Sequence, residues 1–546
     1  MTAEFEQLKQ WITRMALLID ESTDPVPEYY TPFIHEPELA LRLVDLIAEL
    51  DEGALDDERP YYSACVFALD ICVAQLQSAQ ENGNKMGGKT LRQLMSRMAE
   101  TMLHSGHSLS FWLPVLNAFY EVHTELSPEL KGAYLELAER EDDLTPEEES
   151  NHLNAIREMI EELSDLSVFD IAENFFAQSY AMPEDFFADL MIDLYSIDTG
   201  QDIALLLLLH PKSEVRAIVA ATMEQLIDTI QFSSISLSRL QAIKNWYPPE
   251  YQEQFNRWIK IQRKKGVVFH HETTASPSFR LKASEVDGSG AQGIFIHVKQ
   301  RRHNRLCGLL FKQDFGIKDA WMTPAIPAKD IAGYYDEAFD DTVTLRDVDT
   351  DYLLLLTNHF LALTLRQGAM PDLHLLEIQE LLGLHFYPEL MDIPAIMDRL
   401  SVQISPFTPE AMQASFKRSN RWTTGKKFTE SWFIENAHID KLVNRCSSFV
   451  EGVRVCDVET AMAHVFEQDM ELHRDKWFFH FLWVTLWLKA KARKGEKMWW
   501  DSFFIAHAIA EETPLENIPV MRAICRQTVI NSVETMNERR THLNKE

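Results

Sequence analysis

The sequence predicts a mainly helical protein, with a helical array, a small antiparallel β module in the middle and a helical C-terminal domain. Two observations support this fold class. Apolar residues recur at helical spacing along most of the chain, as they do in residues 3–19. Alternation of apolar and polar residues, which is typical of a half-buried strand, is concentrated in residues 266–318. We therefore expect helices on both sides of one short β segment.

The N-terminal region, residues 1–145, is predicted to be helical and strongly acidic. Amphipathic helices are expected over residues 3–19, 37–50 and 60–80, with prolines at the intervening turns. Residues 1–256 contain 46 Asp and Glu against 15 Lys and Arg, whereas the remainder is nearly balanced, and the whole chain has a formal net charge of −32. This asymmetry suggests two surfaces with different partners; well-solvated acidic helices would show it equally.

The cysteines and the apolar runs bear on the compartment. The six cysteines include no C-x-x-C pair, which argues against a zinc ribbon and a disulfide framework, so we expect free thiols in a reducing cytoplasm. The chain starts without an apolar secretion segment. Its most apolar runs, residues 203–209 and 477–488, are shorter than the roughly 18 residues of a membrane span, so no membrane association is expected.

Residues Gly83–Thr90 match the phosphate-binding pattern G-x-x-x-x-G-K-[ST] in full. In a P-loop, Lys89 would bind the outer phosphates of a nucleotide and Thr90 would bind Mg²⁺. A buried strand leads into such a loop, but a polar helix end precedes Gly83 here. We therefore favour a glycine-rich connection between helices, with nucleotide binding as the alternative.

A helical-pair region is expected over residues 146–265, with its boundary in the acidic run at 139–150. Within it, residues 202–228 combine an apolar segment, a proline-containing turn and a second helix with Val215, Arg216 and Ala220. This stretch resembles one repeat of the HEAT or armadillo type. The resemblance implies stacked neighbouring helices, because one repeat cannot bury its own apolar stripe, and it implies scaffolding without catalysis. We recognise no family for the whole chain.

The β module is predicted over residues 266–328. Strands are expected at residues 267–269, 278–286, 293–299 and 306–311. The connection between the second and third of these contains Asp287-Gly288-Ser289-Gly290. Asp287 and Ser289 could form a polar site that binds an anion, but ordinary turn chemistry explains both residues, and we favour the turn.

Basic residues gather near the β module, where residues 257–318 contain 13 Lys and Arg. Arg301, Arg302 and Arg305 lie at the predicted tip of a hairpin and are candidate contacts to an anion or to nucleic-acid phosphates. The alternative is a basic patch that is solvated or that docks on the acidic half of the molecule, and we favour this alternative.

A second basic segment, residues 416–432, interleaves cations with aromatic rings. This pattern suits single-stranded nucleic acid, since rings can stack on bases while cations follow phosphates. Alternatively, the aromatic rings anchor the segment to the core and the lysines stay in solvent, and we favour this interpretation. The candidate contacts are Lys417, Arg418, Arg421, Trp422, Lys426 and Lys427.

The four predicted regions are 1–145, 146–265, 266–328 and 329–546, the last a helical C-terminal domain. The sequence contains no complete catalytic constellation, so we assign no catalytic residue, metal ligand or cofactor. We expect a non-enzymatic cytoplasmic scaffold or adaptor that binds another protein. One alternative is a nucleic-acid-binding protein that uses the basic segments of its C-terminal half, and a second is a nucleotide-binding enzyme that uses Gly83–Thr90.

Overall fold

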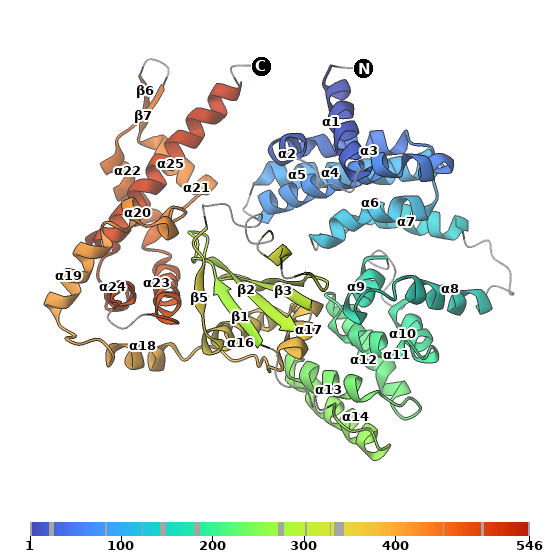
Figure 1. Ribbon diagram of the computed structural model, residues 1–546. Coiled ribbons are helices and arrows are strands. Elements are labelled where there is room, and N and C mark those ends of the chain that lie inside the picture. The colour runs from blue at the N-terminus through green and yellow to red at the C-terminus, as the bar shows by residue number, and fades with distance from the viewer. Residues whose placement is uncertain are drawn as a thin grey trace. The chain divides into compact units, whose positions relative to one another are not determined.

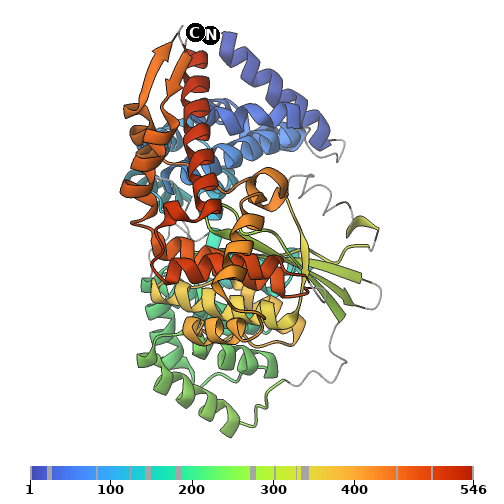
Figure 2. The same cartoon turned by 90° about the vertical axis from the view of Figure 1, so that its left-hand side faces the viewer.

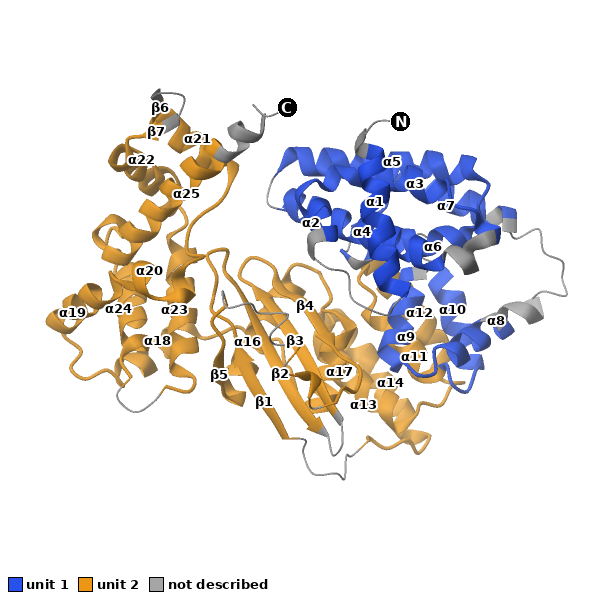
Figure 3. Cartoon of the chain, turned by 45° about the horizontal axis from the view of Figure 1, so that its top comes forward, with its two compact units in different colours: residues 1–200 blue, residues 201–546 orange. Residues whose placement is uncertain are grey.

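The protein is described by a computed structural model, and its chain divides into two compact units, residues 1–200 (unit 1) and 201–546 (unit 2). Figure 3 colours the two units separately. The structure describes residues 3–20, 27–81, 84–122, 124–141, 149–178, 186–270, 278–300, 303–327, 329–331, 333, 343–450, 453–492 and 496–543.

Unit 1 is formed by helices throughout its described residues (Figure 1). Its α-helices are α1 (Ala3–Asp20), α2 (Pro27–His35), α3 (Ala40–Ala48), α4 (Leu55–Glu81), α5 (Lys85–Ser105), α6 (Leu109–Glu121), α7 (Pro128–Glu141), α8 (Glu149–Glu162), α9 (Val168–Gln178) and α10 (Phe186–Ser196).

Helix α4 is the centre of unit 1. It packs against α1, α2, α3, α5 and α6, and it buries Cys65, Leu69, Cys72 and Val73 among them. Among the described helices, α4 has the length and apolar composition of a membrane span over residues 59–81. Because five helices of the same unit surround it, we interpret its apolar character as that of a core helix.

Unit 1 carries most of the charge of the protein. Residues 1–200 contain 40 Asp and Glu against 11 Lys and Arg, a net charge of −29, whereas residues 201–546 contain 44 against 41, a net charge of −3. The change in charge therefore coincides with the division between the two units.

Unit 2 combines helices with a five-stranded antiparallel sheet. The strands of unit 2 are β1 (Ser278–Ala283), β2 (Ala291–Gln300), β3 (His303–Lys312), β4 (Gly316–Met322), β5 (Arg346–Val348), β6 (Ser447–Val450) and β7 (Val453–Cys456). Its α-helices are α11 (Gln201–Ala204), α12 (Ser213–Leu226), α13 (Ser234–Ile243), α14 (Gln252–Lys264), α16 (Thr350–Arg366), α17 (Leu373–Leu382), α18 (Ile393–Ser401), α19 (Pro409–Ser419), α20 (Trp422–Gly425), α21 (Ala437–Arg445), α22 (Val458–Val465), α23 (Arg474–Lys489), α24 (Met498–Ala510) and α25 (Pro519–Leu543).

The main sheet has the strand order β4-β3-β2-β1-β5, and β6 and β7 form a separate hairpin. Side chains alternate across the sheet, so Ile294, Ile296 and Val298 of β2 all point to one face, where they are buried. Helices α16 and α17 pack on this face, with α16 beside β4 (Figure 2). The ring of Phe311 on β3 stacks on Phe360 of α16 at a centroid distance of 5.0 Å.

A buried glutamine joins the sheet to two helices. The Gln292 side-chain oxygen accepts a hydrogen bond from the Tyr352 hydroxyl at 2.7 Å and another from the Trp483 indole at 3.0 Å. These bonds connect β2 to α16 and α23, and they satisfy polar groups that would be costly to bury alone.

The repeat-like stretch, residues 202–228, forms α11, a 3-10 helix over Leu205–Leu209 and then α12. Arg216 is buried at the turn between them and donates to the carbonyl oxygens of His210 and Pro211, at 2.8 and 2.7 Å, and to that of Gly368 at 3.0 Å. This arginine therefore holds the helical turn and joins it to the loop after α16.

The mainly helical class with a central antiparallel sheet and a helical C-terminal region is confirmed. The strand predicted at residues 267–269 is wrong, since this segment follows α14 without pairing. Strands β4 and β5 were not predicted, and β5 lies beyond the expected 266–328 module. The division at residue 200 falls inside the predicted 146–265 region, and the four predicted boundaries stay predictions.

Candidate functional site

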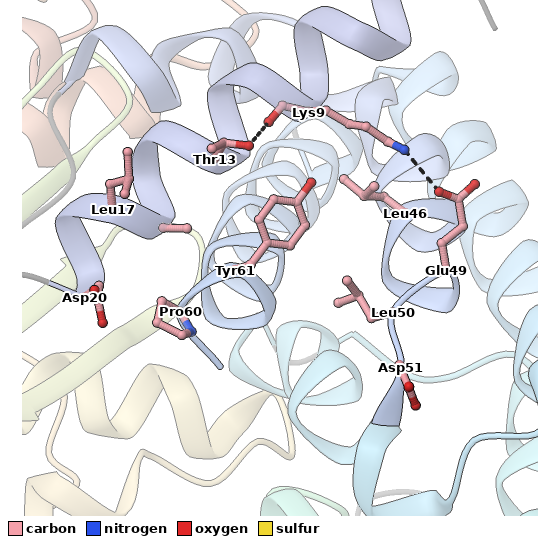
Figure 4. A pocket seen from close by; sticks show the side chains of 11 residues that line it. Lys9, Thr13, Leu17, Asp20, Leu46, Glu49, Leu50, Asp51, Pro60 and Tyr61 are labelled. Atoms are coloured by element: carbon pink, nitrogen blue, oxygen red, sulfur yellow. Dashed lines mark hydrogen bonds and ion pairs between the residues drawn. The ribbon is translucent and has the colours of Figure 1, made fainter. Parts of the chain in front are cut away.

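A groove with a volume of about 640 Å³ lies on unit 1 and is the candidate binding site. Helices α1, α3 and α4 form its walls (Figure 4). Its apolar lining consists of Ala16, Leu17, Leu46, Leu50 and Pro60. Its polar lining consists of Lys9, Thr13, Asp20, Glu49, Asp51 and Tyr61.

Each wall follows from the local sequence. In α1, Ile12 and Met15 are fully buried, so helical spacing turns Thr13 and Leu17 outward toward the groove. In α3, Leu43 and Ile47 enter the core, while Leu46 lies at the floor of the groove. Figure 4 shows Leu17 on one side of Tyr61 and Leu46 with Leu50 on the other. The apolar surface is therefore contributed from two facing walls.

Leu17 is the most exposed apolar residue of the groove. Its side chain is 61% exposed, although α1 has a buried face available on the opposite side. An exposed leucine beside other apolar side chains in a concave site is a feature of binding surfaces, whereas single exposed leucines are ordinary.

The rim of the groove is acidic. Lys9 Nζ forms an ion pair with Glu49 Oε2 at 3.2 Å, and this pair bridges α1 and the end of α3. Asp20 and Asp51 add exposed carboxylates at the ends of the two walls. In a unit of net charge −29, these groups give the groove a negative potential that favours a cationic ligand.

The residues that match a P-loop start a helix. Asn84 caps α5 by accepting hydrogen bonds from the backbone N–H groups of Met86 and Gly87, and residues 85–90 are helical. Helix α4, rather than a strand, precedes them. A Cβ atom at Gly87 would lie 2.8 Å from the Cβ atom of Ala79, so the glycine permits close packing of α4 on α5. The structure therefore supports the connection between helices; Gly83 lies outside the described residues.

Asp287 and Ser289 form a turn. The Asp287 carboxylate accepts hydrogen bonds from the Ser289 hydroxyl and from the Ala291 backbone N–H, both at 2.8 Å. Gly290 has a φ of +78°, which explains a glycine there. A Cβ atom at Gly288 would lie 2.0 Å from the Ser431 carbonyl oxygen, so the turn docks closely on the segment that follows α20. The Ser289 hydroxyl and the Ala291 N–H, which could donate to an anion, therefore donate to Asp287 instead.

The predicted hairpin between β2 and β3 is present, but Arg301 and Arg302 at its tip lie outside the described residues. Arg305 lies within β3 and is half-buried. Its guanidinium is 3.8 Å from a Glu377 carboxylate oxygen on α17 and within 3.6 Å of Met322 Sδ. Arg305 therefore lies on the helix-covered face of the sheet, beside α17.

The second basic segment separates into core rings and outer cations. Trp422 is only 3% exposed and makes edge contacts with Phe428 and Trp432, so it offers no ring face to a base. Lys417, Arg421, Lys426 and Lys427 are exposed. Arg418 is committed to Asp501 of α24, whose carboxylate accepts from Arg418 Nε at 3.0 Å. This arrangement supports the interpretation in which the rings anchor the segment.

Burial makes several reactive groups of the described chain inert. It raises the pKa of the Cys72, Cys307 and Cys525 thiols to about 12, and all six cysteines are free. Burial also lowers the pKa of His480 to about 3, and no hydrogen bond is made by its Nε2 atom among the described residues. These groups lie in cores rather than beside a nucleophile or base.

Comparison with known proteins gives relatives without an assigned activity. Residues 183–266 match the family described as the Y4lR second domain, and residues 394–533 match the Y4lR C-terminal helical domain. The chain is 24% identical over 356 residues to the "Uncharacterized protein y4lR" of Sinorhizobium fredii (strain NBRC 101917 / NGR234). This alignment covers 64% of the chain and 66% of the relative. No solved structure matched the chain.

The repeat-like stretch at residues 202–228 lies within the first of these matches, and the groove of unit 1 lies outside both. The groove was not predicted from the sequence. Its residues come from α1, α3 and α4, and in the sequence they were expected on the solvent-facing sides of these amphipathic helices. The one available signal was Leu17, an apolar residue next to the predicted buried stripe of the first helix.

Proposed function

We propose that the protein is a non-enzymatic adaptor whose unit 1 binds a basic, apolar helical segment of another protein. The observation that carries this proposal is the groove of unit 1, in which facing apolar side chains lie below a carboxylate rim. An amphipathic helix would place apolar side chains between Leu17 and Leu50 and Lys or Arg beside Asp20 and Asp51. A cytoplasmic location belongs to the same proposal, since buried free thiols suit a reducing compartment.

The shape and charge of the groove favour a peptide over a small molecule. Small-molecule sites enclose most of the surface of their ligand, whereas Leu17 leaves this groove open to solvent. The net charge of −29 on unit 1 would attract a cationic segment from a distance and repel a polyanion. Both properties fit a partner helix that carries Lys or Arg beside its apolar stripe.

The first test is a titration of the intact protein with a fluorescent amphipathic helix of Leu and Lys. Leu17→Glu should weaken binding about tenfold or more, because one buried leucine contact is lost and a charge is introduced. Leu166→Glu is the matched control, since Leu166 is an exposed leucine elsewhere on unit 1. A helix of the same pattern in Leu and Glu should not bind.

Lys9→Ala gives a prediction of the opposite sign. Removing Lys9 frees Glu49 and makes the groove more negative, so binding of the Leu–Lys helix should tighten by up to about fivefold at low salt. Equal effects of Leu17→Glu and Leu166→Glu, or weaker binding on loss of Lys9, would contradict the proposal. Selection from a random peptide library would then show which chemistry, if any, the groove prefers.

A further inference from the structure

The main sheet of unit 2 has a second face that differs from the helix-covered one. Across this face the register aligns Lys282 of β1 with Phe295 of β2, Phe295 with Gly308 of β3, and Gly308 with Trp321 of β4. Phe295 and Trp321 are half-buried and Leu310 is exposed, whereas Leu306 and Asn304 of β3, which share this face, are buried. In Figure 3, α16 and α17 lie behind the strands.

Two aromatic rings lie on glycines of this face. A Cβ atom at Gly308 would be 2.3–2.5 Å from three atoms of the Trp321 indole, so the indole rests directly on the backbone of β3. A Cβ atom at Gly293 would be 3.0 Å from two atoms of the Phe295 ring. The two ring centroids are 6.4 Å apart. Glycine beneath each ring keeps the aromatic groups low on the sheet, and because the ring planes are inclined at 53°, each ring offers its own face for stacking.

Cations follow the same face. Arg280 and Lys299 are exposed and lie diagonally across β1 and β2, and Lys282 stands directly opposite Phe295. At the other end of β3, Lys312 lies 4.9 Å from the centre of the exposed Phe315 ring. On the outer strands, Asp347 of β5 stands directly opposite Lys282, and Asp319 of β4 stands opposite Leu310. Arg280 and Lys299 are therefore the exposed cations of this face whose register partners are not acidic.

We propose that this sheet face binds single-stranded nucleic acid, with bases on Trp321 and Phe295 and phosphates beside Arg280 and Lys299. Base stacking on aromatic rings with cations along the backbone is how sequence-tolerant single-strand binding works. A duplex keeps its bases stacked internally and gains nothing from two rings on a sheet. An acidic peptide would use the cations but would leave the paired ring platform without a role.

This site differs from the segments singled out in the sequence. The rings of residues 416–432 are in the core, and their outer lysines accompany no exposed ring stack. The sheet face brings its rings and cations together from four strands, so only the strand register reveals it. It also lies in the unit that carries little net charge.

The test is fluorescence anisotropy of the full-length protein with labelled oligo(U) and oligo(dT) at several salt concentrations, with a duplex of the same length alongside. Trp321→Leu should weaken single-strand binding at least about fivefold, and Trp321→Phe should restore most of it. The double variant Arg280→Ala/Lys299→Ala should reduce the slope of log K against log salt by about 1.4, at about 0.7 for each lost phosphate contact.

The matched variant is Lys417→Ala/Lys426→Ala, which removes two exposed cations of unit 2 that lie on α19 and after α20 rather than on the sheet, and it should leave binding unchanged. Because Arg280 and Lys299 are exposed, their loss tests the site even if Trp321→Leu fails to fold. The proposal is overturned if no oligonucleotide binds at low salt, if only the Lys417/Lys426 pair matters, or if duplex binds as tightly as single strand. Binding of polyglutamate as tight as that of oligo(U) would assign the face to acidic peptides instead.

Discussion

At the scale of single residues, Gly87 shows how a motif match can have a packing cause. A Cβ atom at this position would meet the Ala79 Cβ atom at 2.8 Å and the Leu76 carbonyl oxygen at 3.2 Å. Gly87→Ala should therefore lower the free energy of unfolding of unit 1, even though alanine is the better helix former. The measurement is denaturant unfolding followed by circular dichroism.

Gly132→Ala is the control for this prediction. Gly132 lies inside α7, and a Cβ atom there would meet nothing within 4 Å. The substitution should stabilise the unit by about 0.8–1.0 kcal/mol, the difference in helix propensity between the two residues. Lys89→Ala should change stability by less than about 0.5 kcal/mol, because Lys89 is exposed. Equal effects of Gly87→Ala and Gly132→Ala would show that α4 and α5 do not pack as described.

His480 should make unit 2 sensitive to acid. The imidazole contacts the rings of Trp432 and Trp477, and burial lowers its pKa to about 3 from an unfolded value of about 6.5. Above about pH 6.5 the imidazole is neutral in both the folded and the unfolded state. As the pH falls from about 6.5 toward 3, only the unfolded state takes up the proton, so the free energy of unfolding should fall by about 1.4 kcal/mol for each pH unit.

His480→Phe should reduce the slope of the unfolding free energy against pH by up to the equivalent of one proton, because phenylalanine cannot take up a proton in the unfolded state. Stability at neutral pH should stay equal or rise, since the variant removes a buried nitrogen that makes no hydrogen bond among the described residues. Unfolding curves of both proteins between pH 7 and pH 5 provide the measurement. Parallel losses of stability in the two proteins would rule out this role for His480.

At the scale of elements, one ion pair fastens α19 to α24. The Asp501 side chain is only 5% exposed, and burial raises its pKa while the hydrogen bonds from Arg418 oppose that rise. Arg418→Ala would leave this carboxylate buried without its cation, so the free energy of unfolding of unit 2 should fall by about 2 kcal/mol. This figure lies below the usual range for a buried pair because Arg418 is 45% exposed.

Arg421→Ala is the matched substitution for Arg418→Ala, since it removes the same exposed charge three residues away. It should change stability by less than about 0.5 kcal/mol. If both variants lose the same stability, the pair with Asp501 does not hold these helices together.

Elements were predictable from the sequence where a local pattern was strong. The alternation in residues 278–311 predicted β1, β2 and β3. Strand β5 has three residues, too few for a period to be recognised. Strand β4 was not predicted because it directly follows a tight turn and contains charged residues.

The site residues were less predictable because sites join distant segments. The phosphate-like pattern at Gly83–Thr90 and the turn at Asp287–Gly290 both carry local signals, and local packing explains both. The groove of unit 1 and the second face of the main sheet depend on contacts across α1, α3 and α4 and across four strands. A single sequence records which residues are apolar but not which of them meet on one surface of the folded chain.

At the scale of the whole molecule, the charge is divided between the two units, with −29 on residues 1–200 and −3 on residues 201–546. Binding of the Leu–Lys helix to unit 1 should therefore weaken steeply as salt is raised, because ions screen the carboxylates of the rim and of the unit around it. Titrations at low and physiological ionic strength measure this effect. Binding that is independent of salt would mean that the acidic rim takes no part.

The central claim is that the groove of unit 1 binds a basic amphipathic helix, and hydrogen–deuterium exchange of the full chain with and without the Leu–Lys helix tests it most directly. The account predicts slower exchange in α1, α3 and the start of α4, with no change in the sheet of unit 2. It also predicts that Leu17→Glu abolishes this protection. Protection confined to unit 2, or protection of α1 that persists in Leu17→Glu, would contradict the claim.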